Sequence, residues 1–273
     1  MPRIAVLQMT SGVEPEANFA VIEAAVHQAS AGGAAMLFTP EMSLLLDRNR
    51  QRAALHILPQ DTSPFVPMLA GLARDTGVTI ALGSMAVALP TGKNANRSML
   101  FAPGAAGPIT YDKIHMFDVE LATGEAWRES AAYEPGQQVV SAENTPVGRL
   151  GMTVCYDLRF PALFGALGER RCDAIAVPAA FTRPTGAAHW HVMLRARAIE
   201  ASAFVIAAAQ VGLHEDGRAT YGHSLVVDPW GEVLLDMGGE SPGLAFCDID
   251  LTRIAEVRAQ VPALANRRKI ATS

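Results

Sequence analysis

The stretch GMTVCYDLRFP, residues 151–161, places a cysteine where an apolar run ends and a helix-like segment begins. Residues 150–154 have the composition of a buried strand, and residues 161–171 have the pattern of a helix. Backbone N–H groups at such a junction point toward negative charge, and the positive end of a helix favours a thiolate. Cys155 is therefore a candidate nucleophile, although a lone cysteine is more often a small buried hydrophobic residue.

Apolar runs and helical patterns alternate along the chain, which indicates a single α/β domain over residues 1–273 with a tail from about 262. Hairpin-like neighbours around the turn 103–107 predict mixed sheets rather than purely parallel ones. Gly83 indicates a β-bulge in its strand, and the polar segment 117–138 is interpreted as a long loop. The expected strands are 3–9, 35–39, 78–89, 97–101, 108–111, 150–154, 173–177, 204–209, 225–227, 232–235 and 243–250; the expected helices are 19–29, 65–72, 161–171, 190–198 and 251–261, the last with Asp250 as its N-cap.

Charge and hydropathy argue against several classes of protein. The 273 residues carry a formal net charge of −5 at pH 7, whereas nucleic-acid-binding proteins usually present a basic face. The one basic run, 267–269, falls in the tail. No apolar stretch is long enough to cross a membrane, and residues 1–10 do not form a signal peptide. We therefore expect a cytoplasmic protein that binds neither nucleic acid nor membranes.

The cysteines support the same localisation. Cys155, Cys172 and Cys247 are an odd number without the spacing of a disulfide framework, which fits reduced thiols in a cytoplasm. Cys172 precedes an expected strand and Cys247 lies inside one, so both are interpreted as core residues. No Cys-x-x-Cys pair indicates zinc, and the sequence predicts no metal site.

Two other stretches could serve Cys155. Residues 38–42, FTPEM, deliver Glu41 at the end of an expected strand, and residues 111–115, YDKIH, contain Lys113. A thiol near neutral pH is mostly protonated; a carboxylate can accept its proton, and an ammonium group can lower its pKa and hold an oxyanion. Alone, Glu41 and Lys113 would each be interpreted as solvated surface residues. They form a candidate site only together with Cys155.

Histidines are the rivals for the base, because a Cys–His pair is a common nucleophile arrangement. His189 and His191 are two residues apart, so their rings would point in nearly opposite directions and would not share a metal ion. A serine hydrolase is unsupported, since Ser98 and Ser224 lack the Gly-x-Ser-x-Gly elbow. The histidines considered as bases are His115, His189, His191 and His223.

The three motifs, in this order and spacing, resemble those of the nitrilase superfamily of carbon–nitrogen hydrolases. The resemblance covers nearly the whole chain, from the run 3–8 to the residues around Pro262. It implies a four-layer α-β-β-α sandwich in one domain. It also implies a homodimer or higher homo-oligomer, since members of the family usually dimerise with their sheets continuing across two subunits.

The resemblance implies a role for each motif residue. Glu41 would be the general base, Lys113 the oxyanion stabiliser and Cys155 the nucleophile. Glu129 matches a second glutamate that orients the lysine and positions the substrate. The backbone N–H of Tyr156 would complete the oxyanion hole, and this chemistry needs no cofactor.

Two further stretches look like the branch of small amidases in this superfamily: GAAHWHVMLRARAIE at 186–200 and YGHSLVVDPWG at 221–231. That branch contains the deaminated-glutathione amidases and the omega-amidases, which act on amides of α-keto dicarboxylic acids. The run RARAIE, 195–200, looks closer to the former. The expected reaction is hydrolysis of a small carboxylate-bearing amide to an acid and ammonia. A nitrile hydrolase, an N-carbamoyl amino-acid hydrolase and a catalytically silent scaffold are the alternatives, and the intact motif residues speak against the last.

Carboxylates on the substrate would need a cation to hold them. Taken alone, each candidate arginine is more simply interpreted as a charged surface residue. Arg159 could instead pair with Asp157 in the same turn. The candidates near the motifs are Arg48, Arg50, Arg128, Arg159 and Arg183.

Overall fold

The computed structural model describes residues 1–120, 124 and 126–268. The last residue of the basic run, Lys269, lies outside the described residues. Within the described part, no helix combines the length and apolar character needed to cross a membrane. The described end of the tail lies against helix α4 (Pro161–Glu169), where Arg267 Nη1 donates to the Gly165 carbonyl at 2.7 Å.

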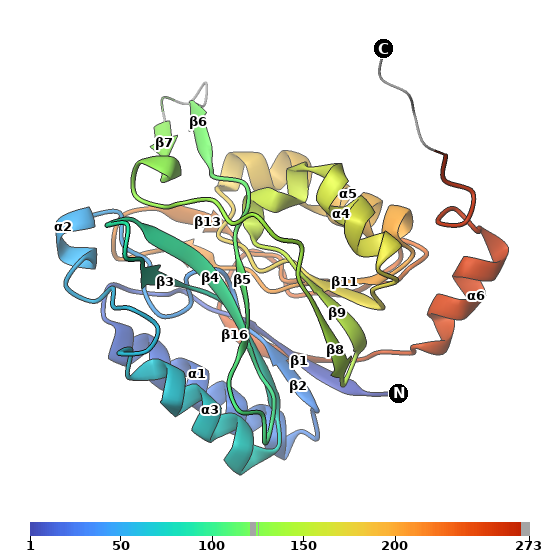
Figure 1. Cartoon of the computed structure of the whole chain (residues 1–273), viewed down its shortest axis with the longest axis horizontal. Coiled ribbons are helices and arrows are strands. Elements are labelled where there is room, and N and C mark those ends of the chain that lie inside the picture. Colours follow the sequence, from blue (N-terminus) through green and yellow to red (C-terminus); the bar gives the residue numbers. More distant parts are fainter. Residues whose placement is uncertain (121–123, 125, 269–273) are drawn as a thin grey trace.

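Two mixed six-stranded sheets form the centre of the molecule, as predicted (Figure 1). The first has the order β16-β1-β2-β3-β4-β5, and the second has the order β15-β14-β11-β10-β9-β8. Each has three parallel strands in its middle and antiparallel strands at both sides. The strands of the first sheet are β1 (Arg3–Gln8), β2 (Met36–Phe38), β3 (Thr79–Ala88), β4 (Asn94–Phe101), β5 (Ile109–Asp112) and β16 (Gly243–Asp248); those of the second are β8 (Ser141–Thr145), β9 (Gly148–Met152), β10 (Ala174–Ala176), β11 (Phe204–Ala207), β14 (Leu225–Val227) and β15 (Val233–Asp236).

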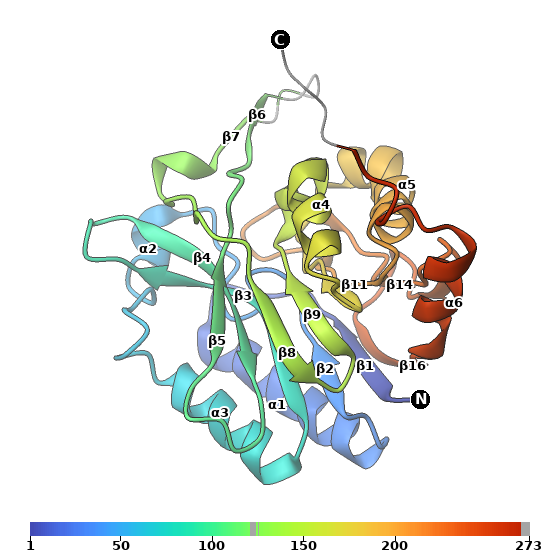
Figure 2. The ribbon, with the colours of Figure 1, turned by 45° about the vertical axis from the view of Figure 1, so that its right-hand side comes forward.

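Helices cover the outer face of each sheet, which makes the four-layer α-β-β-α sandwich (Figures 1 and 2). Helices α1 (Pro15–Ala31) and α3 (Phe65–Thr76) pack on the first sheet, and α4 and α5 (Arg183–Ala201) pack on the second. Strand β1 shows how the sequence builds these layers, because successive side chains of a strand point to opposite faces. Ile4 and Val6 belong to the core between the sheets, whereas Ala5 and Leu7 belong to the core under α1 and α3.

The segment 117–138 corrects the expectation of a long loop. It contains a hairpin of β6 (Asp118–Glu120) and β7 (Ala126–Arg128), followed by a 3₁₀ turn at Glu129–Ala131. The apolar periodicity is weak here because the hairpin projects beyond the two sheets and buries little of itself (Figure 1). The hairpin matters for the candidate site because the 3₁₀ turn after it begins at Glu129.

Smaller elements also escaped the sequence patterns. The short helix α2 (Arg50–Ala53) and the two-stranded sheet of β12 (Val211–Leu213) and β13 (Ala219–Tyr221) were not expected. The last helix, α6, spans Thr252–Gln260, and Asp250 accepts a hydrogen bond from the Thr252 N–H at 3.0 Å. The predicted N-cap is therefore off by one residue, since Leu251 occupies that position and Asp250 precedes it.

Candidate active site

A pocket of about 790 Å³ opens at the end of the sheets from which the catalytic motifs emerge. Glu41, Lys113, Glu129 and Cys155 all line it. They come from segments that follow β2, β5, β7 and β9. The structure thus brings together the four side chains that the motifs single out.

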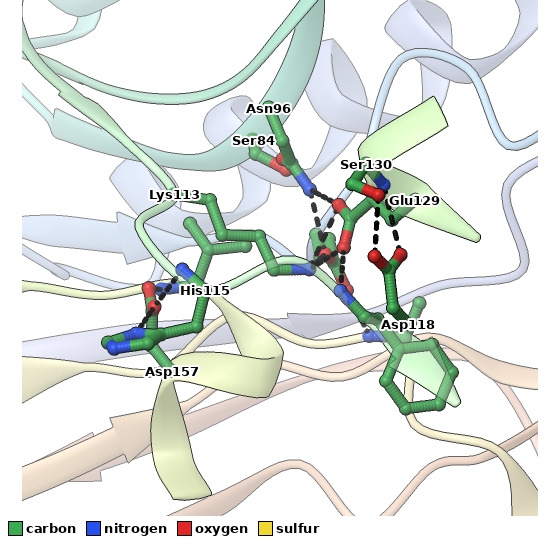
Figure 3. A network of polar contacts seen from close by, with 12 residues as sticks. Ser84, Asn96, Lys113, His115, Asp118, Glu129, Ser130 and Asp157 are labelled. Atoms are coloured by element: carbon green, nitrogen blue, oxygen red, sulfur yellow. Dashed lines mark hydrogen bonds and ion pairs between the residues drawn. The ribbon is translucent and has the colours of Figure 1, made fainter. Parts of the chain in front are cut away.

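Lys113 is the centre of a buried ion cluster (Figure 3). Its Nζ lies 3.0 Å from Glu41 Oε1, and 3.0 and 2.8 Å from the two oxygens of Glu129. The Lys113 side chain is only 2% exposed. Asn96 of β4 joins the cluster, since its Nδ2 donates to Glu41 at 2.9 Å and to Glu129 at 3.1 Å.

The cluster determines the charge of each member. Burial alone would raise the pKa of Glu41, but the charge of Lys113, the neighbouring Cys155 and hydrogen bonds from Lys113 and Asn96 hold that pKa below its ordinary value. Burial opposes the charge of Lys113 as well, yet Glu129 and Glu41 raise its pKa well above the usual range. At neutral pH Glu41 is therefore a carboxylate and Lys113 an ammonium group.

Cys155 lines the pocket beside Glu41, and its resting form is the thiol. Burial and the Glu41 charge raise the pKa of Cys155 well above its ordinary value, and the opposing effect of Lys113 is smaller. The expected preference for a thiolate at this turn is therefore wrong for the resting site.

The loop that carries Glu41 is held by hydrogen bonds from three directions. Ser84 Oγ accepts from the Met42 N–H at 2.9 Å, and Gln210 Nε2 donates to the Glu41 carbonyl at 3.0 Å. The second oxygen of Glu41 accepts from the Ala180 N–H at 2.9 Å. The carboxylate is thereby fixed between Lys113 and the cysteine.

Gly83 allows this loop to lie against β3. The predicted bulge is present, because the pairing of β3 with β4 shifts register between Leu82 and Met85. A Cβ atom on Gly83 would lie 2.1 Å from the Thr39 carbonyl oxygen and 2.2 Å from that of Pro40. Only a residue without a side chain permits the approach.

Gly83→Ala is therefore expected to lower the free energy of unfolding by about 1–3 kcal/mol, because the added methyl group meets backbone rather than a flexible side chain. It should also lower kcat by displacing Glu41. Chemical denaturation and initial rates measure the two effects. Gly107→Ala is the control for a change of glycine alone, since a Cβ there meets nothing within 4 Å and its backbone is not left-handed. Wild-type stability and rate for Gly83→Ala would contradict the prediction.

The turn after β9 presents Cys155 to the pocket. Cys155 has a left-handed backbone, φ 49°, and begins the 3₁₀ segment Cys155–Arg159. Asp157, fully buried, holds the turn together with the Lys113 segment. Its carboxylate accepts from the Val154 N–H at 2.9 Å, from the Tyr111 hydroxyl at 2.7 Å and from the His115 N–H at 3.0 Å. Two motifs distant in sequence thus share one buried carboxylate (Figure 3).

Two successive N–H groups of this turn differ in whether they have a hydrogen-bond partner. The Cys155 N–H donates to the Pro178 carbonyl at 2.8 Å. The next N–H, that of Tyr156, has no hydrogen-bond partner among the described residues. It is the group that the resemblance assigns to the oxyanion hole, and its position at the start of a 3₁₀ segment leaves it free to donate.

None of the four histidines considered as bases lines the pocket in the described structure. His115 Nδ1 lies 2.7 Å from Asp157, and its ring stacks on Phe160. His189 and His191 point apart, as predicted: His189 contacts Arg159 at 3.2 Å, and His191 contacts Asp236 at 3.0 Å. His223 also contacts Asp236. The described contacts therefore give no support to a Cys–His pair.

The structure separates the candidate arginines. Arg48, Arg50 and Arg128 line the pocket, whereas Arg159 and Arg183 do not. The Arg159 guanidinium lies over the Tyr156 and Phe181 rings rather than beside Asp157, so the suggested pair with Asp157 is wrong. Arg183 Nε donates to the Thr220 carbonyl at 3.4 Å.

Three functional residues escaped the sequence argument. Asn96 has no sequence feature that separates it from other polar residues in strands. Its importance follows from its burial, which no local pattern predicts. Arg218 lines the pocket from the loop between β12 and β13, which was not recognised as a hairpin. Asp157 belonged to a quoted motif, but its partners on the Lys113 segment are apparent only in three dimensions.

Comparison with known proteins agrees with this fold and site. Residues 3–259 match the model of the carbon–nitrogen hydrolase family, and the chain belongs to that family. It is 40% identical over 275 residues to a deaminated glutathione amidase of Yersinia enterocolitica, covering 98% of this chain and 94% of that protein.

Solved structures show the same architecture. The Caenorhabditis elegans NitFhit protein aligns with a TM-score of 0.89 and 33% identity, covering 98% of this chain; this chain spans 65% of NitFhit. An amidase of Nesterenkonia sp. AN1, whose active-site cysteine carries acrylamide by Michael addition, aligns with a TM-score of 0.79 and 26% identity, covering 96% of this chain and 98% of that one.

Proposed function

We propose that this protein is a thiol amidase that hydrolyses a small carboxylate-bearing amide to an acid and ammonia. The name of its relatives, deaminated glutathione amidase, indicates such an amide. One observation carries the proposal: a buried cysteine lines the same pocket as a glutamate that is paired with a buried lysine. The Yersinia relative supports the choice of substrate. Omega-amidase activity, nitrile hydrolysis and N-carbamoyl amino-acid hydrolysis use the same groups and are the alternatives.

The first half of the reaction begins with proton transfer. Glu41 accepts the thiol proton of Cys155, and the sulfur attacks the amide carbonyl carbon. The carbonyl oxygen becomes an oxyanion, which Lys113 Nζ and the Tyr156 N–H stabilise. Glu41 then passes the proton to the amide nitrogen, and the C–N bond breaks. Ammonia departs, and the acyl group remains on Cys155 as a thioester.

The second half reverses the roles. Glu41 takes a proton from a water molecule, whose oxygen attacks the thioester carbonyl. The same two donors hold the oxyanion until the C–S bond breaks, and Cys155 recovers the proton from Glu41. Glu129 and Asn96 keep Lys113 and Glu41 in place throughout, because each contacts the cluster from the side.

The expectations on assembly and localisation also remain proposals. A cytoplasmic location is supported by the reduced cysteines, since the described chain contains free thiols at Cys155, Cys172 and Cys247. A homodimer is supported by exposed apolar side chains along α5 and its neighbours, which a second copy would cover: Val192, Ile199, Trp230 and Leu234.

The pH dependence should distinguish a glutamate base from a histidine base. The lowered pKa of Glu41 keeps its carboxylate charged, so activity is lost only as pH falls below the ordinary glutamate value of about 4.3. The raised pKa values of Lys113 and Cys155 keep both protonated, so the alkaline loss begins above the ordinary thiol value of about 8.5. We expect kcat/KM to be flat between about pH 5 and 8. An inflection near pH 6.5, the ordinary histidine value, would contradict Glu41 as the base.

The cations of the pocket support a substrate with carboxylates. The guanidinium groups of Arg48 and Arg218 lie 5.6 and 5.1 Å from the centre of the Trp127 ring. Arg218 is paired with Asp216 at 2.8 Å, whereas Arg48 has no ion pair among the described residues. Arg50 has no ion pair among these residues either, but its Nη2 already donates to the Arg128 carbonyl at 3.0 Å. Arg48 is therefore the cation best able to bind a carboxylate.

Arg48→Gln is expected to raise KM about tenfold or more with little change in kcat, because a charge-assisted hydrogen bond is lost equally from substrate and transition state. Steady-state kinetics on a carboxylate-bearing amide measures the change. Arg74→Gln, on the exposed face of α3, is the control. An unchanged KM for Arg48→Gln would remove Arg48 from substrate binding.

The function itself is tested by ammonia release from four substrates: deaminated glutathione, α-ketoglutaramate, a simple nitrile and an N-carbamoyl amino acid. We expect the highest kcat/KM with deaminated glutathione. A preference for α-ketoglutaramate would keep the mechanism and change the assignment to omega-amidase. Release from none of the four would contradict the proposed activity and favour a scaffold.

A further inference from the structure

Outside the pocket, two histidines and an aspartate from three separate elements meet on the surface. His191 lies on α5, His223 on the connection from β13 to β14, and Asp236 at the end of β15. His191 Nε2 lies 3.0 Å from Asp236 Oδ2, and His223 Nδ1 lies 2.9 Å from Asp236 Oδ1. None of the three lines the pocket, so the amidase chemistry does not account for their convergence.

We propose that His191, His223 and Asp236 form a binding site for a divalent transition-metal ion such as Zn²⁺. One ligand atom from each residue lies within 4.8 Å of the other two. Around a tetrahedral Zn²⁺ with bonds of about 2.0–2.2 Å, ligand atoms are about 3.3 Å apart. Closing the set needs a shift of about 1.5 Å at most, which partly exposed side chains can make by small rotations.

The donor set favours this class of ion. Imidazole nitrogen suits zinc and its neighbours in the transition series, whereas Mg²⁺ and Ca²⁺ prefer sites made of oxygen atoms. In the metal-free protein the imidazole N–H groups point at the carboxylate, and the ion would take the place of those protons. Three protein ligands leave one position for water.

Surrounding contacts hold two of the ligands in place. The Gly238 N–H donates to Asp236 Oδ1 at 2.9 Å. The backbone of His223 is fixed at both ends: its N–H donates to the Gly238 carbonyl at 2.8 Å, and its carbonyl accepts from Trp190 Nε1 at 2.8 Å. Such outer contacts are characteristic of metal sites, because they orient the ligands before the ion arrives.

The ring of Tyr221 forms one side of the site. It stacks on the His223 ring at 4.5 Å between centroids and meets the His191 ring edge-on at 6.0 Å. A bound ion would join α5 to the edge strand β15 beside the exposed Val192. This site departs from the sequence expectation of no metal, which weighed His191 only with its neighbour His189.

The experiment is a calorimetric titration of Zn²⁺ into the full chain carrying Cys155→Ala, which removes the pocket thiol as a competing ligand. We expect one Zn²⁺ per chain. Adding His191→Ala, His223→Ala or Asp236→Asn should raise Kd at least about tenfold, the effect that loss of even an outer contact has. His189→Ala, on the same helix, is the matched control and should leave Kd unchanged.

Two further measurements keep the result clear. Circular dichroism without metal shows that each variant is folded, and Asp236→Asn preserves the shape of the side chain. Co²⁺ in place of Zn²⁺ should give an absorption spectrum of nitrogen and oxygen ligands, without the charge-transfer band of a thiolate. No uptake by the parent chain, equal Kd in all variants, or a thiolate spectrum would each overturn the proposal.

Discussion

Cys155→Ala is expected to lower the rate of ammonia release by at least about 10⁴-fold, the scale at which removal of a nucleophile acts in other hydrolases. The thioester forms on this sulfur alone, and an alanine offers neither the attacking atom nor the proton that Glu41 accepts. The fold should survive, because the change removes one sulfur atom from a turn that Asp157 holds through three backbone and side-chain donors.

The two other cysteines are the matched controls. Cys172 is buried against Gly151, and Cys247 lies on β16, both away from the pocket. Cys172→Ala and Cys247→Ala should retain wild-type kcat, and only the former should cost stability through a small cavity. Normal turnover by Cys155→Ala would remove the proposed mechanism, whatever the substrate.

Lys113→Met is expected to lower both activity and stability. Loss of one oxyanion donor costs about 10²–10³ in kcat in other enzymes. In addition, Glu41 and Glu129 would be left as buried carboxylates without their cation, and breaking a buried pair in this way costs about 3–5 kcal/mol. Methionine nearly matches the length of the lysine stem, so the effect of packing is small. Steady-state rates and chemical denaturation measure the two losses.

A comparison across pH separates the electrostatic cost from any packing cost. In Lys113→Met the unpaired carboxylates can be protonated at mildly acidic pH, so the difference in stability from wild type should shrink as pH falls from 7 toward 5. Lys93→Met is the control. Among the described residues, this surface lysine donates only to the Ser130 carbonyl, so its loss should change neither the rate nor the stability. A stability difference that is constant with pH would indicate packing instead.

Much of the fold follows from local patterns. Alternation in β1, helical spacing in α1 and the glycine at 83 each reflect short-range steric and hydrophobic preferences that a single sequence displays. The strand β9 also follows from its apolar run, and Pro161 marks the start of the helix after the turn. The resemblance then connected three motifs that local patterns left unrelated.

The alternating elements, the α/β class and the three motif residues Glu41, Lys113 and Cys155 could all be predicted from the amino-acid sequence. The chemical states of these residues could not, because the pKa of each depends on burial and on charges contributed by segments far away in the chain. The same holds for Asn96 between two carboxylates, and for Asp236 between two histidines. These contacts join residues that share no local pattern; they exist because packing two sheets and their covering helices brings the ends of distant strands together.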